Sequence, residues 1–453
     1  MAKAKKAAAK HKVPRKASAR PSKTKTGGAE TVHTFGRTRP SQSGKWPIHT
    51  QPERDTHFRP LPPSTGKPPY RLDLKSILPS ADYQAIVAAK RLVFHLNGDM
   101  GGIKTGIEQT LVAKGMEQDF REKGRPADNP AFLYILGDCV YYNGEIKEYY
   151  SQFYEPYEFF PRPIFAVPGN HDGENLPGGQ PLDGFLRNFC APAPVKMPEA
   201  QDSNRTAMTQ PNVYWTLLTP LVSIVGLYSN VPAGGEIASP QTEWLVEELK
   251  SLPDDLPILV ALHHPVYSAD NHHSGSTAMK KVIEDASEAA GRHPDMVLAG
   301  HVHNFQRLTK TMPDGTQIPY IVAGAGGYYH LHSMMKVGYE GEPETMIPPV
   351  TFPDKQGDPV TLERYCSDHH GFVRMEVTEK LITGRYYSVP RPHDPYSKPS
   401  QLVDYFEFDW KKKRLIPNTL PTPSVNEVSV SVKGRRASPE GQTARRTASA
   451  ARR

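Results

Sequence analysis

Seven short apolar runs, separated by longer polar stretches, mark the middle of this 453-residue chain. They span residues 92–96, 132–136, 164–167, 221–227, 258–262, 296–299 and 320–323, and most are followed within three residues by glycine, aspartate or histidine. Runs of this length are typical of β-strands that are buried on both faces. The intervening stretches 106–123, 241–252 and 276–292 are candidates for helices. This alternation predicts an α/β or α+β domain.

The two ends of the chain differ in charge from its middle. Residues 1–45 carry 13 Lys and Arg against a single acid, Glu30, and residues 411–453 carry 11 against two acids. Since the whole chain has 55 basic and 48 acidic residues, residues 46–410 have a net charge of −14. The basic pI of about 9.0 therefore reflects the ends of the chain, and the middle is acidic.

The low complexity of both ends predicts that they are disordered. We expect a basic, proline-rich tail and linker over residues 1–69, one folded domain over 70–410 and a basic tail over 411–453. Such tails either bind a polyanion, nucleic acid or polyphosphate, by releasing counterions, or only keep a disordered segment solvated. Aromatic residues are not interleaved at either extreme end, so base stacking is not expected.

Cysteine usage and hydropathy bear on the compartment. Cys139, Cys190 and Cys366 are an odd, sparse set that gives neither a disulfide framework nor a CxxC metal pair. No apolar run approaches the roughly 18 residues of a membrane-spanning helix. The N-terminus is basic but lacks the apolar core of a secretory signal. We expect a cytoplasmic protein, with an organellar location through a transit-like basic N-terminal segment as the alternative.

Five polar segments lie at the ends of predicted strands. They are 98–101 (GDMG), 137–141 (GDCVY), 169–172 (GNHD), 263–265 (HHP) and 300–303 (GHVH). In α/β folds the functional residues lie in loops just beyond the carboxyl ends of strands. Carboxylate and phenolate oxygens suit a hard cation, and imidazoles suit a divalent transition metal. We therefore infer a site for two metal ions, which would neutralise the negative charge of a phosphoester and promote its hydrolysis.

In order and content the five segments resemble the calcineurin-like metallophosphoesterases and, within that family, the purple acid phosphatases. The resemblance covers roughly residues 90–390, where the stretches 320–327 (YIVAGAGG) and 370–372 (HGF) are also similar to family segments. It implies the calcineurin-like metallophosphoesterase fold, in which two mixed β-sheets pack as a sandwich flanked by helices. The disordered basic tails lie outside the resemblance.

The resemblance implies that Asp99, Asp138, Tyr141 and His303 hold the first metal ion. Many relatives begin with Asp-x-His, whose histidine is a ligand, but here Asp99 is followed by Met100 and glycine. Tyr141 stands where the phenolate-using members place their substitute ligand. Because the loss and the replacement occur together, the resemblance implies Fe(III) at the first site.

The resemblance also implies a second, divalent metal ion, which is Fe, Zn or Mn. Asn170, His263 and His301 would hold this ion, and Asp138 would bridge the two metals. His171 matches the family histidine that contacts the substrate phosphate.

Three further histidines are candidates for catalysis. His272 and His273 lie nine and ten residues after His263, near the offset at which purple acid phosphatases place a histidine that reaches the phosphate or the leaving group. We hypothesise that one of the two donates the leaving-group proton, and the sequence does not choose between them. His264, next to a predicted ligand, either belongs to the site or is a packed neighbour.

Two more groups of residues leave alternatives open. The stretch 141–160 is dense in aromatic residues, which we expect mainly to pack, with substrate stacking as the alternative. His330 and His332 either line the pocket or pack locally in a loop.

The function implied is a phosphomonoesterase of purple acid phosphatase type, in which a metal-bound hydroxide attacks the phosphorus of a phosphorylated small molecule in line. Two alternatives stay open. The same centre would also serve a phosphodiesterase, a phospholipase C-like enzyme or a nuclease, with the basic tails recruiting a polyanion. The third interpretation is a polyanion- or partner-binding protein with a vestigial metal core, although the complete set of ligands argues against it.

Overall fold

The computed structural model describes residues 61–121, 124–173, 182–229, 235–337, 344–354, 357–395 and 397–417, together with the backbone of 50–51. The predicted basic tails therefore lie outside the described residues, apart from the backbone of 50–51 and residues 61–69 and 411–417. Among the described residues, no helix combines the length and the apolar character needed to cross a membrane.

Two large sheets, both mixed, organise the described part of the chain. The first sheet has the order β15 (Val350–Pro353), β16 (Pro359–Cys366), β11 (Phe305–Thr311), β12 (Gln317–Ala323), β10 (Met296–Ala299), β8 (Ile258–Leu262), β7 (Ser223–Gly226), β6 (Trp215–Leu218) and β2 (Arg71–Asp73). Its central strands β12, β10, β8 and β7 are parallel to their neighbours in this run.

The second sheet has the order β20 (Arg414–Ile416), β19 (Gln401–Asp409), β18 (Leu381–Ser388), β17 (Gly371–Thr378), β3 (Arg91–Asn97), β4 (Leu133–Leu136) and β5 (Ile164–Val167). Here β3, β4 and β5 are parallel, and the other pairs are antiparallel. Two short pairs complete the strands: β1 (Thr50–Gln51) with β9 (Gly275–Ser276), and β13 (Lys336–Val337) with β14 (Glu344–Thr345).

The helices connect these strands. They are α1 (Ser80–Ala89), α2 (Ile107–Gln118), α3 (Asp183–Phe189), α4 (Ser239–Ser251) and α5 (Thr277–Ala290), with short helical turns at Leu74–Ser76, Pro126–Asp128, Ile146–Glu148, Tyr150–Tyr154 and Pro198–Ala200. Local chemistry sets the bounds of α5: the Ser276 hydroxyl accepts the N–H of Met279, and Gly291 ends the helix with a φ of 68°.

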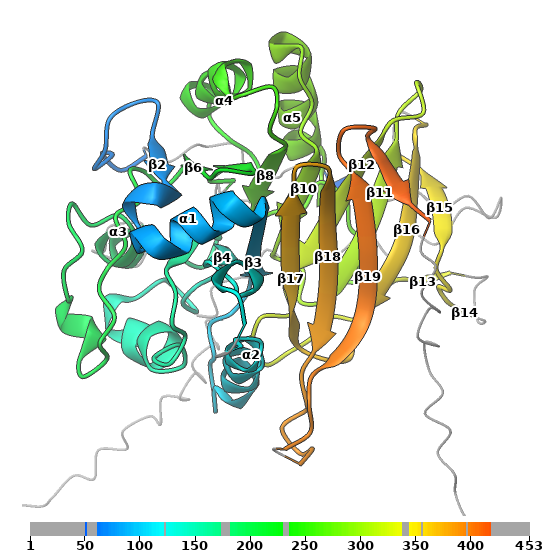
Figure 1. The fold of residues 1–453 in the computed structure, drawn as a ribbon. Helices are drawn as coiled ribbons and strands as arrows, with labels where there is room; N and C mark the ends of the chain where they lie inside the picture. Colours follow the sequence, from blue (N-terminus) through cyan, green and yellow to red (C-terminus); the bar gives the residue numbers. More distant parts are fainter. Residues whose placement is uncertain are drawn as a thin grey trace, which may run out of the picture. The chain divides into compact units, whose positions relative to one another are not determined.

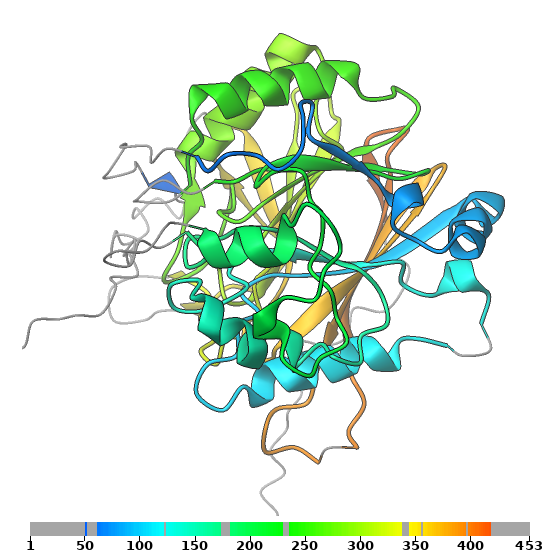
Figure 2. The ribbon, with the colours of Figure 1, turned by 90° about the vertical axis from the view of Figure 1, so that its left-hand side faces the viewer.

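Alternate residues of the central strands enter different layers of the core. In β4, Tyr134 and Leu136 face the other sheet, whereas Leu133 and Ile135 pack under α2. The outer face of the first sheet packs in the same way under α4 and α5. Figures 1 and 2 show the sheets face to face, with α4 and α5 on one side and α2 on the other. The predicted sandwich of two mixed sheets flanked by helices is confirmed.

This arrangement gathers the polar segments at one edge. The parallel strands β3, β4 and β5 of one sheet, and β8 and β10 of the other, each end just before one of the five segments. Since strand direction fixes where a chain leaves the sheet, the five loops emerge together.

A column of aromatic rings joins the two sheets, and it generates a prediction about stability. Phe94 stacks on Phe132 at 4.9 Å between ring centroids, and Phe132, Phe165 and Trp215 continue the contact into the other sheet. Replacing Phe94 by alanine leaves a cavity in this core, so we expect the free energy of unfolding to fall by about 3–5 kcal/mol.

Denaturant unfolding followed by circular dichroism measures this loss. The matched control is Phe159→Ala, because Phe159 is 77% exposed and the same truncation there should change stability by only about 0.5 kcal/mol. Equal losses in the two variants would contradict a core at Phe94.

Candidate metal centre

Three donor atoms from three loops form the first triad. The Tyr141 hydroxyl lies 3.3 Å from Asp99 Oδ1 and 3.4 Å from His303 Nε2, and His303 Nε2 lies 3.5 Å from Asp99 Oδ1. Donors bound at about 2.1 Å to one ion are about 3.0 Å apart in octahedral and about 3.4 Å apart in tetrahedral geometry. The spacing of the triad therefore fits ligands of a single metal ion.

A second triad lies beside the first. Asn170 Oδ1 is 3.0 Å from His263 Nε2 and 3.1 Å from His301 Nδ1, and the two imidazole nitrogens are 3.2 Å apart. One amide oxygen and two imidazoles are a donor set that suits a divalent transition metal.

Asp138 lies between the two triads. Its Oδ2 is 3.4 Å from His263 Nε2, and Asp99, Asp138 and His263 offer ligand atoms that all lie within 4.8 Å of one another. Its Oδ1 accepts the backbone N–H of His171 at 2.9 Å. This position, with one carboxylate adjoining both triads, is the one that a bridging ligand requires.

Hydrogen bonds from the ring nitrogen that points away from the cluster orient two of the imidazoles. His263 Nδ1 donates to the carbonyl of Leu136 at 2.8 Å, and His303 Nδ1 donates to the carbonyl of His330 at 3.0 Å. Both histidines therefore present Nε2 to the cluster. Such second contacts fix the tautomer and the ring orientation that a metal ligand needs.

The backbone of the site is strained where its ligands lie. Asp99, Asp138 and His301 have φ angles of 56°, 54° and 66°, a region that residues with a Cβ rarely adopt. Gly169 serves a different purpose, because a Cβ at this position would collide with Asp138 Oδ1 and with the Asp138 backbone N–H. The glycines of the motifs thus permit the close approach of neighbouring loops.

Burial and mutual charge shift the titration of the cluster. Asp99, Asp138 and Tyr141 are at most 1% exposed. Burial, followed by the charges of Asp138 and Asp99, raises the pKa of Tyr141 well above its ordinary value. Burial lowers the pKa of His263, but Asp138 outweighs this effect and raises the pKa to about 9. Both raised pKa values show that the cluster favours positive charge and disfavours further negative charge. A cation would stabilise such a cluster, so the donors present fit metal ions.

The catalytic candidates surround the cluster at different depths. The His171 ring lies 4.5 Å from the Tyr141 ring and donates from Nδ1 to the carbonyl of Tyr142 at 2.7 Å. His273 is 4% exposed, with its ring 4.3 Å from that of His301. The structure therefore brings His171 and His273 to the centre.

Of the other two candidates, only His264 adjoins the second triad, since His263, His264 and His301 offer ligand atoms that lie within 4.8 Å of one another. The His272 ring lies 4.7 Å from His332 and 6.2 Å from His330, and the side chain of His272 is only partly buried. His264 is buried with its ring 4.4 Å from His301, and its Nδ1 lies 3.1 Å from the hydroxyl of Ser229.

Several residues that support the site have no clear signal in the sequence. Gln152 accepts the N–H of Tyr141 at 2.8 Å and donates to its carbonyl at 2.7 Å, so it clamps the backbone of a predicted ligand. His332, for which the sequence left pocket lining and local packing open, stacks on His303 at 4.2 Å, and Asp270, which was not predicted, lies 3.3 Å from His332 Nδ1. Only Asp172, the last residue of GNHD, lay within a motif. It accepts the N–H groups of Cys139, Val140 and Gly169.

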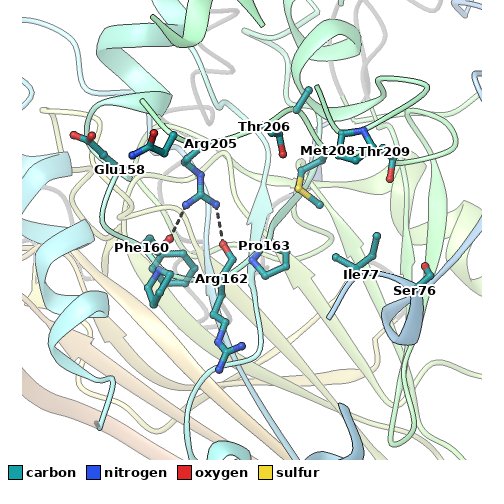
Figure 3. A pocket seen from close by; sticks show the side chains of 14 residues that line it. Ser76, Ile77, Glu158, Phe160, Arg162, Pro163, Arg205, Thr206, Met208 and Thr209 are labelled. Atoms are coloured by element: carbon teal, nitrogen blue, oxygen red, sulfur yellow. Dashed lines mark hydrogen bonds between the residues drawn. The ribbon is translucent and has the colours of Figure 1, made fainter. Parts of the chain in front are cut away.

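A cavity of about 470 Å³ lies elsewhere in the molecule. Its lining includes Phe160, Arg162, Pro163, Arg205 and Met208, and it contains none of the predicted site residues. Figure 3 shows the Arg205 guanidinium engaged by backbone carbonyls of Phe160 and Arg162, at 2.6 and 2.7 Å. The guanidinium of Arg205 thus bonds to backbone in the wall of the cavity. The cavity is not part of the metal cluster.

The match to the model of the calcineurin-like phosphoesterases covers residues 94–305, which contain all seven predicted metal ligands. The chain contains a calcineurin-like phosphoesterase domain. The phosphoesterase domain is also similar to two Arabidopsis thaliana proteins, "Probable purple acid phosphatase 20" and "Purple acid phosphatase 21", at 29% identity over 160 and 174 residues. The resemblance predicted from the five motifs is confirmed.

These matches cover 34% and 37% of this chain, which spans only 34% and 36% of the two relatives. Among solved structures, purple acid phosphatase PPD1 from yellow lupin (Lupinus luteus) seeds aligns with a TM-score of 0.48 at 16% identity, over 70% of this chain and 54% of that one. GAP50, the anchor in the inner membrane complex of Plasmodium, aligns with a TM-score of 0.46 at 17% identity, over 72% and 90%.

The contact between Gly169 and Asp138 generates a prediction about metal binding. We expect Gly169→Ala to weaken metal retention by at least roughly tenfold, because the added Cβ displaces the carboxylate that adjoins both triads. Metal content per folded protein, measured by mass spectrometry after dialysis against a weak chelator, gives the result.

Gly291→Ala is the matched control. Gly291 has a φ of 68° but no atom within 4 Å of an added Cβ, so this variant should lose about 1 kcal/mol of stability and keep its metal. If Gly169→Ala retains metal as Gly291→Ala does, the close approach at Asp138 is not required.

Proposed function

We propose that this chain is a binuclear, metal-dependent phosphomonoesterase of purple acid phosphatase type. The observation that carries the proposal is the pair of donor triads joined by Asp138 within a calcineurin-like phosphoesterase domain. The substrate would be a phosphorylated small molecule.

The proposed ligands follow the two triads. Asp99, Asp138, Tyr141 and His303 would hold Fe(III), and Asp138, Asn170, His263 and His301 would hold divalent Fe, Zn or Mn. When bound, two such cations neutralise the phosphate charge and lower the pKa of a water molecule. Burial and the charges of Asp138 and Asp99 raise the pKa of Tyr141, so its phenol would ionise as a ligand only with a cation beside it.

The remaining work falls to the side chains around the cluster. Asp138 would fix the separation of the two sites, since the N–H of His171 holds its carboxylate in place. His171 would contact a phosphate oxygen, because the hydrogen bond to Tyr142 keeps its ring beside Tyr141. Of the two adjacent histidines, we assign His273 to the leaving-group oxygen, since its ring lies closer to the cluster than that of His272.

The organisation of the chain belongs to the same proposal. Residues 70–410 would be one catalytic domain between basic segments, in a cytoplasmic protein. The described structure continues past this boundary to β20, which pairs with β19. The basic ends would add affinity only for substrates with many phosphates, because counterion release scales with the number of phosphates contacted.

The identity of the first metal ion can be tested by colour. We expect purified protein to hold two metal ions and to absorb visible light through a phenolate–Fe(III) bond, and we expect Tyr141→Phe to lose this band. Tyr134→Phe is the matched control, because Tyr134 is equally buried but lies in strand β4, before the loop that carries Tyr141, and its substitution should leave both colour and activity unchanged. A folded but colourless wild-type protein containing Fe(III) would exclude the phenolate ligand.

Turnover tests the reaction itself. We expect hydrolysis of phosphomonoesters, and Asp138→Asn should lower kcat by at least roughly a thousandfold, because the carboxylate that adjoins both triads loses its charge. A panel of monoesters and diesters, assayed with the full chain, separates the candidate reactions. Activity confined to diesters would replace the proposed function by the phosphodiesterase alternative.

A further inference from the structure

Three tyrosines form a rim on one side of the metal cluster. We call Tyr142, Tyr328 and Tyr329 the aromatic rim. Tyr328 packs directly on the cluster, with its ring 4.4 Å from that of Tyr141 and 4.5 Å from that of His303. Exposure increases outward, from 1% at Tyr141 to 7% at Tyr328 and 46% at Tyr142. The rim therefore leads from the buried donors to solvent.

Tyr142 is the ring of the rim that is most available to a ligand. Its neighbours Tyr141, His171 and Tyr328 meet it at interplanar angles of 80°, 66° and 82°, so none of the three stacks face to face on it. Its backbone is held in place, because its carbonyl accepts the Nδ1–H of His171. An aromatic ring that is nearly half exposed and anchored beside the cluster is a preformed stacking surface.

The other large rings nearby are already occupied. Tyr329 has the Lys104 ammonium 3.4 Å from its ring centroid and contacts Tyr328 at 4.9 Å. In the same segment as Tyr142, the rings of Tyr149, Phe153 and Tyr154 are buried in the core. Packing thus explains these aromatics, but it does not explain the exposure of Tyr142.

We propose that the site selects phosphoesters whose leaving group carries a planar aromatic ring, and that Tyr142 selects them by stacking on this ring. The inference rests on the proposed function and names its substrate class. A phosphoester held at the cluster and contacted by His171 would carry its leaving group on an ester oxygen close to the His171 ring. Because the Tyr142 ring lies 6.0 Å from the His171 ring, a group attached through that oxygen comes within reach of Tyr142.

Two matched substrates isolate the effect of the ring. Benzyl phosphate and cyclohexylmethyl phosphate have leaving alcohols of similar size and acidity, and they differ in planarity. We expect the wild-type chain to have the higher kcat/KM on benzyl phosphate. Tyr142→Leu should lower the benzyl-to-cyclohexylmethyl ratio roughly threefold to tenfold, the range measured for aromatic pairs. Tyr142→Phe, which keeps the ring, should retain the wild-type ratio.

Phe159→Leu is the matched control for the loss of an exposed aromatic. Phe159 is 77% exposed and precedes the amino end of β5, whereas the metal loops follow the carboxyl end of that strand. We expect this variant to keep the wild-type ratio. Circular dichroism and metal content of each variant verify that the fold and the cluster are intact.

A binding measurement separates this inference from the proposed function. Benzylphosphonate and cyclohexylmethylphosphonate cannot be hydrolysed, and their dissociation constants measured by calorimetry should give the same preference and the same loss in Tyr142→Leu. If the wild-type chain hydrolyses neither ester, the proposed function fails, but the phosphonate ratio still decides the role of Tyr142. Equal ratios in wild type and Tyr142→Leu, in both turnover and binding, would overturn the inference.

Discussion

At the centre of the site, the carboxylate of each of two neighbouring loops accepts backbone N–H groups of the other loop. The geometry of the ligands depends on these reciprocal hydrogen bonds. Asp138, beyond β4, accepts the N–H of His171, and Asp172, beyond β5, accepts the N–H groups of Cys139 and Val140. Each loop thus satisfies backbone donors of the other, in a region with almost no access to water. Burial and the charge of Asp138 raise the pKa of Asp172 to about 6. The two carboxylates therefore place negative charge close together, where cations would be held.

The same principle ties the two sheets together at this edge. The N–H of His301, from the first sheet, donates to Asp99 Oδ2 of the second sheet at 2.7 Å. In the other direction, His263 Nδ1 donates to the carbonyl of Leu136. Because each of these contacts involves a predicted ligand, a shift of one sheet against the other would separate the donors. The packing of the sandwich therefore determines the distances within the cluster.

Parts of this fold and site were predictable from the sequence for identifiable reasons. Strands β5, β8 and β10 coincide with apolar runs, because strands covered on both faces need apolar side chains at consecutive positions. Strand β16 was not predicted, since its burial alternates and leaves a polar residue at every second position. The predicted helix over 106–123 is shorter in the structure, where α2 ends at Gln118.

In the site, too, some residues were predictable from the sequence and others were not. The candidate ligands lie in short motifs directly after strands, so residue type and order were enough to suggest them. Gln152 escaped notice because it acts through a backbone clamp, and the sequence left the role of His332 open because its ring stack on His303 appears only in the folded loops. The sequence left His272 and His273 open, and the difference in depth appears only once the loop is folded.

Electrostatics further limits what the domain is suited to bind. Residues 46–410 have a net charge of −14, and the four cations at 411–414 reduce it to −10 over 46–417, so this part of the chain repels polyanions at long range. Attraction for phosphate must then be local, and it would come from metal ions held by a buried cluster rather than from a broad basic surface. A small ester with one phosphate loses little from such repulsion, whereas a long nucleic acid would experience it along its whole length unless the basic ends compensated. Since the phosphate group is the same in all monoesters, discrimination must then depend on the leaving group, which in our proposal stacks on the exposed ring of Tyr142.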